Sequence, residues 1–296
     1  MISILTCSYN RESYLSKLYE SLLNQTNHNF EWVIIDDGSE DGTGKLIESF
    51  VRQTKEFTIR YYWQKNGGKH RAFNKGMEIV SGTWVFSVDS DDTLTQDAIE
   101  TVYGWIRNLE KESDYDKFAA VSGLRMTVCG NRLGGYPKSE KYQYYIDAKN
   151  NERRKYKLTG DKAEVYKSVI LRNYPFPTFD DEKFISEEVV WNKIAMDGYK
   201  IRWYPKAIYI CDYLEGGLTK DNHKWVDNFK GFTYQTKISI SVCKGIYIMR
   251  PISKYIYWAK MTGLTQKEIM NNLNISYRCY LVGVIIMKIY RIGNRI

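Results

Sequence analysis

Closely spaced cysteine pairs and long apolar runs are missing from this sequence of 296 residues, and no basic stretch precedes its first apolar segment. The five cysteines are dispersed and form no CxxC pair, so the sequence indicates neither a disulfide framework nor a zinc site. The longest apolar run near the C-terminal end, Cys279 to Met287, is less than half of the roughly 20 residues that a membrane-spanning helix needs. The first residues carry only a short apolar run with no basic stretch before it, unlike a secretory signal. We therefore expect a cytoplasmic protein that does not span the membrane.

Acidic residues are nearly absent from the last part of the chain. Residues 237–296 hold ten Lys or Arg and one acid, Glu268, so this segment carries +9 and the first 236 residues carry −1. Lys288, Arg291 and Arg295 are spaced to share one helix face. Their apolar neighbours are Leu281, Val284, Ile285 and Ile289. This pattern favours peripheral contact with an anionic membrane, although a helical cap with a solvated charged face has the same composition.

A pattern similar to a helix-turn-helix occurs in the same basic segment, at residues 264–286. A recognition helix needs several side chains that reach base edges. The second helix of this pattern is mostly apolar, which suits packing or a membrane surface better. We keep a DNA-binding protein as an alternative and expect no nucleic-acid partner.

Strand-like and helix-like segments alternate along the first hundred residues. Apolar, β-rich segments occur at residues 2–8, 30–36, 58–64 and 83–92, and segments with helical spacing occur at residues 12–25, 42–53 and 69–82. This order predicts an α/β fold with a Rossmann-like, mostly parallel central sheet and helices on both faces. Ligands of such sheets bind at the carboxyl ends of the strands.

Polar residues collect where three of these predicted strands end. The clusters are "SYN" (Ser8–Asn10), "DDGSEDGT" (Asp36–Thr43) and "DSDDT" (Asp89–Thr93). A tight turn with a helix cap would account for the second cluster on its own. Two adjacent acids are more charge than a turn requires, and a carboxylate there can accept from a nucleobase ring N–H or from ribose hydroxyls.

The third cluster places Asp89, Asp91 and Asp92 directly behind an apolar strand. Neighbouring carboxylates repel one another unless a cation lies among them, and a hard divalent ion with oxygen ligands is the usual solution. An ion held by one or two protein carboxylates keeps open positions for a diphosphate and can neutralise a departing nucleotide. The structural alternative is an Asp-rich loop in which Asp92 caps the following helix.

Four segments resemble, in order and spacing, the family 2 glycosyltransferases, which are inverting enzymes of the GT-A fold. The matching segments are "SILTCSYNRESYLSKLYESLLNQT", "FEWVIIDDGSEDGT", "NGGKHRAFNKGMEIVSG" and "VDSDD". The agreement covers about the first 100 residues. The resemblance implies a UDP-sugar donor, Mn²⁺ or Mg²⁺ as cofactor, and a setting in bacterial surface-polysaccharide assembly.

The resemblance also implies a role for individual residues. Tyr9 and Asp37 would contact the uracil, Asp89 the ribose, and Asp91 the metal that bridges the diphosphate, with Asp92 beside it. The remaining expected donor-binding residues are Ser8, Asn10, Lys69, His70 and Ser90.

Phe73 departs from the family pattern, because many relatives carry Arg there. The basic residues just before it offer substitutes for phosphate contact: Lys69, His70 and Arg71. We interpret His70 as a donor-binding or loop-positioning residue, since a lone His is more often a satisfied hydrogen-bonding residue than a catalyst.

Transfer with inversion needs a base on the far face of the sugar to take the proton of the acceptor hydroxyl. Glu187 and Glu188 lead into a predicted helix in the second half of the chain. By the resemblance, the second acid of this pair is the base, which nominates Glu188 and leaves Glu187 as the alternative. Acids at a helix N-terminus are also stabilised by the helix dipole without any catalytic role.

The segment between the metal motif and this pair is rich in Tyr, Lys and Arg, as expected of a variable acceptor side. Asp161 and Lys162 are candidates to line the acceptor site. Further on, Gly216 and Gly217 form a predicted flexible loop from which Thr219 or His223 would reach the phosphates.

We therefore expect a GT-A domain at residues 1–225, with a nucleotide-binding half at 1–100 and an acceptor half at 101–225. A basic helical extension is expected at residues 226–296. The predicted activity is metal-dependent transfer of a sugar from a UDP-sugar to a glycan or lipid-linked glycan, at the inner face of the plasma membrane or in the cytoplasm, by a chain that can form a homo-oligomer. A phosphatase is the other enzymatic alternative, because "DSDDT" also fits a phosphoryl-accepting Asp motif.

Overall fold

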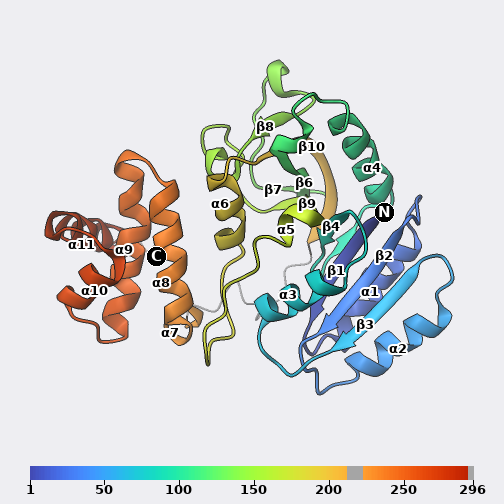
Figure 1. Cartoon of the computed structure of the whole chain (residues 1–296), viewed down its shortest axis with the longest axis horizontal. Coiled ribbons are helices and arrows are strands. Elements are labelled where there is room, and N and C mark those ends of the chain that lie inside the picture. Colours follow the sequence, from blue (N-terminus) through green and yellow to red (C-terminus); the bar gives the residue numbers. More distant parts are fainter. Residues whose placement is uncertain (212–222, 293–296) are drawn as a thin grey trace.

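The computed structural model describes residues 1–211 and 223–292, which form one ten-stranded sheet and a separate group of helices (Figure 1). The strand order is β3-β2-β1-β4-β9-β6-β10-β5, with β7 paired to β6 and β8 paired to β10. The strands are β1 (Ile2–Ser8), β2 (Phe30–Asp36), β3 (Thr58–Trp63), β4 (Trp84–Ser87), β5 (Thr93–Leu94), β6 (Phe118–Thr127), β7 (Arg132–Leu133), β8 (Ile146–Ala148), β9 (Lys162–Lys167) and β10 (Lys200–Cys211).

The first four long strands form the parallel half of the sheet. β1 pairs in parallel with β2 and with β4, and β2 pairs in parallel with β3. The intervening helices are α1 (Glu12–Leu23), α2 (Thr43–Gln53) and α3 (Lys69–Ile79). Because parallel strands end at the same edge, the polar residues after β1, β2 and β4 come together there, as predicted.

The second half of the sheet is mixed. β9 lies between β4 and β6 and is antiparallel to both, whereas β10 is parallel to β6. An antiparallel neighbour needs no crossover helix, so β9 can enter the sheet directly from an irregular segment. The α/β class with helices on both faces is confirmed, and its parallel part is the N-terminal half.

Two apolar cores flank the sheet. α1, α2 and α4 (Ala98–Leu109) contribute to one core, with Leu18, Ile47 and Val102 fully buried. On the opposite face lie α3, α5 (Ser168–Leu171) and α6 (Glu188–Met196), with Ala72 and Val189 fully buried. Because both faces are covered, β1 and β2 are buried along almost their whole length.

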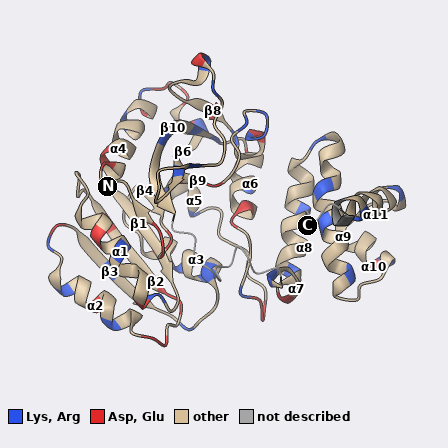
Figure 2. Cartoon of the chain, turned by 180° about the vertical axis from the view of Figure 1, so that it is seen from behind, with Lys and Arg blue, Asp and Glu red and all other residues tan. Residues whose placement is uncertain are grey.

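A third core belongs to the helical extension. It is built from α7 (Lys224–Asp227), α8 (Phe229–Val242), α9 (Met249–Met261), α10 (Gln266–Leu273) and α11 (Tyr277–Ile292). Trp225 already packs against this core, one residue before the predicted boundary. Lys and Arg outnumber Asp and Glu over these helices (Figure 2). Among the described residues, no helix combines the length and the apolar character that a membrane span requires.

The pair α10 and α11 corresponds to the predicted helix-turn-helix. Thr265 and Glu268 form a capping box at the start of α10. α11 packs on α9 so closely that a Cβ on Gly283 would come within 2.7 Å of Ile256. The would-be recognition helix is therefore part of the third core, and the DNA-binding alternative is not favoured.

Candidate active site

The loops after β1 and β2 are tied together by hydrogen bonds. The Asn10 amide N–H donates to Ser39 Oγ (2.9 Å), and Asn10 Oδ1 accepts from the Glu40 amide (2.9 Å). Asn10 adopts a left-handed backbone conformation that Asn tolerates well. Tyr9, next to it, is 46% exposed and available to a ligand, whereas Ser8 is buried. Three of the predicted donor-binding residues thus lie at the end of β1 and in the loop that follows it.

Asp37 is buried and organises the segment that leads into α3. Its Oδ1 accepts from Gln64 Nε2 (2.7 Å) and the Gly67 amide (2.9 Å), and its Oδ2 accepts from the Gly68 amide (2.7 Å). Gly68 has φ 95°, and a Cβ there would overlap the carbonyl of Lys183. The contacts of Asp37 support a loop-anchoring role, and its contact with a base remains a prediction.

Lys69 brings the strand-end acids and the predicted base region together. Its Nζ donates to Asp89 Oδ1 (2.6 Å) and lies 2.8 Å from Glu187 Oε1. Arg125 on β6 is 3.6 Å from Asp89 Oδ2 on the other side. Burial alone would raise the pKa of Asp89, but the two cations hold that pKa well below its usual range. Asp89 is therefore ionised at neutral pH.

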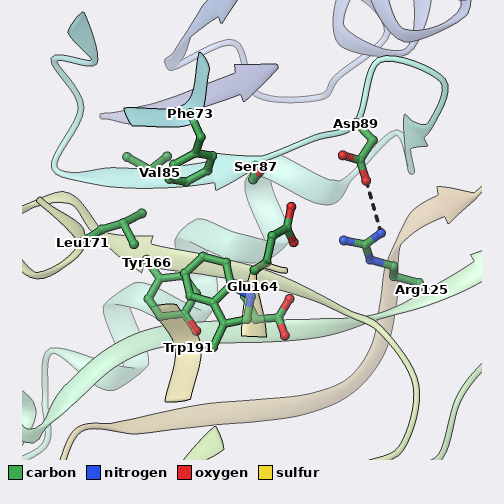
Figure 3. Close-up of a pocket in the computed structure, with 10 residues that line it drawn as sticks. Phe73, Val85, Ser87, Asp89, Arg125, Glu164, Tyr166, Leu171 and Trp191 are labelled. Atoms are coloured by element: carbon green, nitrogen blue, oxygen red, sulfur yellow. Dashed lines mark ion pairs between the residues drawn. The ribbon is translucent and has the colours of Figure 1, made fainter. Parts of the chain in front are cut away.

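A small cavity of about 20 Å³ lies next to this ion-pair network (Figure 3). Asp89 and Arg125 form one end, and the stacked rings of Tyr166 and Trp191, with centroids 4.4 Å apart, line the other. Glu164 on β9 reaches the same cavity, and burial raises the pKa of its carboxyl. Figure 3 shows one wall of charged groups facing one wall of apolar and aromatic groups.

Arg125 is further held by the aromatic ring of Tyr209 on β10, whose centroid lies 4.1 Å from the guanidinium carbon. The Asp89 amide N–H donates to Tyr209 Oη (2.9 Å). The strands β4, β6 and β10 thereby meet at one point. Sequence reasoning missed Arg125, Glu164 and Tyr209, since they lie on strands whose order only the sheet reveals.

Asp91 and Asp92 follow Asp89 but have different surroundings. Asp91 is partly exposed and lies 4.0 Å from Arg11, whereas Asp92 is buried and lies 3.9 Å from Arg125. Asp92 is not a helix cap: Asp97 is the N-cap residue of α4, because β5 separates Asp92 from the helix. Ser90, between the acids, is buried.

The described residues contain no group of three or more His, Cys, Asp or Glu side chains arranged to hold a metal. The donors at the strand end are carboxylate oxygens, which suit Mn²⁺ or Mg²⁺. Asp91, with its weak contact to Arg11, is the carboxylate best placed to add a ligand. These residues fit an ion that takes one or two protein ligands and the rest from a diphosphate and water.

Glu187 and Glu188 diverge at the start of α6. Glu187 lines the cavity with Asp89 and is engaged by Lys69. Glu188 is exposed, accepts from Asn192 Nδ2 (3.2 Å) and lines a second cavity on the side of the helical extension. Of these two acids, Glu187 belongs to the ion-pair network around Asp89. Glu188 instead lines the second cavity, next to the helical extension.

The basic residues predicted to substitute for Arg at position 73 are all engaged by the protein. Arg71 donates to the carbonyls of Glu182 (2.5 Å) and Phe179 (2.7 Å). His70 is buried, and its Nε2 lies 3.2 Å from Arg71 Nη1. Phe73 packs edge-on against Phe176 in the core below α3.

Lys162 and Asp161 do not line either cavity described here. Lys162 is 1% exposed, and its Nζ caps the carbonyls of Thr159 and Gly160 in the turn before β9. Burial lowers the pKa of Lys162 to about 8. An acceptor-site role for Lys162 stays a prediction, and its contacts with the turn do not support that role. The predicted loop with Gly216, Gly217 and Thr219 lies outside the described residues, and His223 is the N-cap residue of α7.

Comparisons with known proteins agree with this architecture. Residues 3–168, more than half of the chain, match the family described as Glycosyl transferase family 2. Glycosyltransferase GlyA of Streptococcus pneumoniae serotype 4 is 26% identical over 76% of this chain and 32% of its own length. Glycosyltransferase GlyG of the same organism is 36% identical over 38% of this chain and 37% of its own length. The chain thus spans about a third of the length of these curated relatives.

Two solved structures share the fold over nearly the whole chain. The structure of S. aureus TarS residues 1–349 with UDP-GlcNAc matches with a TM-score of 0.65 and 18% identity, over 95% of this chain and 79% of that one. A mannosyltransferase from Pyrobaculum calidifontis, solved with GDP-Man and Mn²⁺, matches with a TM-score of 0.55 and 15% identity, over 98% and 80%. The GT-A fold and the match over residues 3–168 together lead to one conclusion: the chain belongs to glycosyl transferase family 2.

Proposed function

We propose that this protein is a metal-dependent inverting glycosyltransferase that moves a sugar from a UDP-sugar to a hydroxyl of a glycan or lipid-linked glycan. The observation that carries the proposal is the convergence of Asp89, Lys69, Arg125 and Glu187 at the carboxyl edge of the parallel strands. In open α/β sheets, this edge is where ligands bind. A phosphatase is not favoured, because Asp89 is ion-paired and the chain belongs to a sugar-transferring family.

The donor and the pathway are supported by what similar proteins bind and make. TarS was solved with UDP-GlcNAc and with UDP, which supports a UDP-sugar as donor here. The minor teichoic acid biosynthesis protein GgaA of Bacillus subtilis is 30% identical over 48% of this chain and 31% of its own length. This likeness supports a role in bacterial surface-polysaccharide assembly.

On the donor side, Tyr9 offers an exposed ring for the base, and Asp89 offers a fixed carboxylate for ribose hydroxyls. Asp91, with Asp92 beside it, would hold Mn²⁺ or Mg²⁺. When bound, such an ion neutralises charge on the departing diphosphate. Lys69 and Arg125 keep Asp89 ionised and in place, so that they position the donor site before the donor arrives.

On the acceptor side, we assign Glu188 as the base. Its carboxylate takes the acceptor's hydroxyl proton as the acceptor oxygen forms the new bond to the anomeric carbon. The bond between that carbon and the diphosphate oxygen breaks at the same time, and the diphosphate leaves with the electron pair. Glu187, engaged by Lys69, is the positioning neighbour.

A screen of UDP-sugars for metal-dependent hydrolysis and for thermal stabilisation tests this function. Asp91→Asn should lose stabilisation by UDP that depends on Mn²⁺, because its carboxylate would supply the metal contact. Glu188→Gln should keep that stabilisation and lose transfer by about 100-fold or more, since an amide cannot accept the proton. Asp116→Asn, which removes an exposed acid away from the site, is the matched control.

The outcomes separate the assignments. If Glu188→Gln turns over nearly normally while Glu187→Gln does not, the base is Glu187. If no UDP-sugar binds or is hydrolysed with either metal, the proposed function fails as a whole.

We also propose that α11 contacts the anionic inner face of the plasma membrane. Leu281, Ile285 and Ile289, spaced four residues apart, are 42%, 57% and 63% exposed. Arg278 and Lys288 are exposed on the same helix. The predicted partner Val284 instead packs against the third core, the side chain of Arg291 is not described, and Arg295 lies outside the described residues.

A further inference from the structure

The second cavity lies between the family 2 domain and the helical extension, and its volume is about 420 Å³. α6 and α8, whose residues line it from opposite sides, are neighbours in Figure 1. On the side of the domain, the lining includes Arg154 and Glu188. On the side of the extension, it includes Gln235 of α8 and Arg250 and Lys254 of α9. Two parts of the chain with separate cores thus build one binding space.

The charge lining this cavity is mostly positive. Arg154, Arg250 and Lys254 face a single carboxylate, that of Glu188. Within residues 1–211 and 223–292, none of these three cations forms an ion pair within 4.0 Å. Burial lowers the pKa of Lys254, and Arg250 and Lys224 lower it further, while Glu188 opposes them. The lining thus carries an excess of positive charge, which an entering anion would balance.

Aromatic rings hold two of the cations in place without neutralising them. The guanidinium of Arg154 lies 4.1 Å from the ring centroid of Tyr247, and Lys254 Nζ lies 4.1 Å from a ring centroid of Trp225. A cation on a ring face keeps its formal charge and its outward N–H groups. The positions of the charges are thus fixed in advance of a ligand.

An uncharged polar group in the lining also lacks a partner. Gln235 is 8% exposed, and its Oε1 accepts no hydrogen bond from the described residues. A buried carbonyl oxygen without a donor carries a free-energy cost that a ligand hydroxyl would remove. The cavity therefore offers both anion-binding and hydroxyl-binding groups.

The cavity adjoins the site of transfer. Glu188 lines it, and the preceding residue, Glu187, lines the smaller cavity that holds Asp89. Consecutive Cα atoms are about 3.8 Å apart, so the two cavities lie on either side of this acidic pair. A molecule in the larger cavity can present a hydroxyl to Glu188 from the side opposite the donor.

We propose that this cavity binds an acceptor that carries a phosphate ester, with the phosphate against Arg154, Arg250 and Lys254 and a hydroxyl at Glu188. The proposal rests on the proposed glycosyltransferase function and adds the chemical class of the acceptor. Phosphate suits the lining because guanidinium and ammonium groups bind its oxygens in charge-assisted hydrogen bonds. The phosphate can belong to a phosphodiester-linked chain or to the head of a lipid-linked glycan.

The test compares the binding of glucose 6-phosphate with that of glucose, by ligand-observed NMR. Saturating UDP and Mn²⁺ are present, so that the donor site is filled. Wild-type protein should bind glucose 6-phosphate at least about tenfold more tightly than glucose. Arg250→Gln/Lys254→Gln should lose this preference, whereas Lys260→Gln/Lys267→Gln, which removes two exposed charges outside the cavity, should keep it.

Arg154→Gln provides an independent variant, because Arg154 belongs to the catalytic domain and its loss leaves the core of the extension intact. It should weaken glucose 6-phosphate binding without changing UDP binding. Equal binding of glucose and glucose 6-phosphate by the wild type, or equal behaviour of the two double variants, would overturn the proposal. Absence of UDP binding would instead overturn the proposed function.

A competition arm identifies the source of the phosphate. Vesicles with phosphatidic acid in phosphatidylcholine, compared with phosphatidylcholine alone, are added to the glucose 6-phosphate complex. Displacement by the phosphatidic acid vesicles supports a lipid-linked acceptor. Retention of glucose 6-phosphate supports a phosphate ester in a soluble chain.

Discussion

At the scale of single residues, the acids at the strand ends differ in what already holds them. The carboxylate of Asp37 accepts from four backbone and side-chain donors of one loop, and that of Asp89 is engaged by two cations. Asp91 has one distant cation at 4.0 Å. Three Asp carboxylates thus differ in role because the protein supplies each with a different number of hydrogen-bond and ion-pair partners.

His70 is a residue whose protonation state follows from its surroundings. Burial, with the nearby Arg71 guanidinium, lowers the pKa of His70 to about 4, so the neutral ring is the folded form at pH 7. A pKa lower in the folded chain than in the unfolded chain gives stability above the unfolded value of about 6.5 that is lost as the pH falls toward 4. His70 therefore favours folding at neutral pH and disfavours it in acid.

We expect the free energy of unfolding to show this directly. Between pH 7 and pH 5, the wild type should lose about 1 kcal/mol more than His70→Gln, after allowance for partial solvent screening. Urea unfolding at both pH values measures the difference. His28→Gln is the control, because its ring lies in a different part of the fold, where its Nε2 donates to the carbonyl of Leu23 (3.0 Å). Parallel pH dependence of His70→Gln and wild type would contradict the assignment.

At the scale of elements, the short strand β8 depends on one buried side chain of β10. Arg202 is 2% exposed and donates from Nε and Nη2 to both carboxylate oxygens of Asp147, at 2.8 and 2.7 Å. Its Nη1 donates to Glu112 at 2.7 Å. The planar guanidinium joins β8, β10 and the segment after α4 in a geometry that Lys cannot reproduce.

Arg202→Met should therefore destabilise the fold by about 2 kcal/mol, less than for a fully buried pair because both acids are partly exposed. Arg202→Lys should recover only part of that loss. Chemical unfolding measures both. Lys200→Met, which removes the more exposed pair with Asp114, should change stability by less than about 0.5 kcal/mol. Equal effects at positions 200 and 202 would refute the proposed role of Arg202.

At the scale of the whole molecule, the proposed transfer site and the proposed membrane-binding surface lie on different parts of the chain. The cavities open around α6, and the exposed apolar stripe lies on α11, which the third core separates from the sheet (Figure 1). Membrane binding and sugar transfer should therefore be separable by mutation.

Leu281→Ser/Ile285→Ser should lower co-sedimentation with phosphatidylglycerol liposomes by about tenfold or more, because two exposed apolar side chains no longer enter the interface. UDP binding should be unchanged. Val128→Ser/Val169→Ser removes two exposed apolar side chains from the glycosyltransferase domain and serves as control. If the double variant still binds liposomes but has a lower apparent mass in solution than the wild type, the exposed apolar residues of α11 form a contact between copies of the chain instead.

The local patterns of the sequence were sufficient for the helices and strands of the first half. Leu15, Leu18 and Leu22 recur at helical spacing and are fully buried, and the apolar strands β1 and β2 are buried on both faces. These features depend on neighbours close in sequence, so the sequence alone shows them.

The order of the strands in the second half of the sheet could not be predicted from local sequence patterns. β9 entered between β4 and β6 and thereby brought Glu164 to Asp89, while Arg125 and Tyr209 came from β6 and β10. The alternative in which Asp92 caps the following helix was wrong, because β5 pairs with the distant β10 before the helix starts. Long-range pairing cannot be read from local periodicity.

The sequence by itself determined the α/β class, the family and the acids at the strand ends, because each is encoded in short segments with their own periodicity or spacing. Only the tertiary structure decided that Glu187 and Glu188 face different cavities and that Arg154 meets Arg250 and Lys254. The physical reason is that a site is a set of distances between side chains. Those distances are fixed by how sheet and helices pack, not by the residues between them.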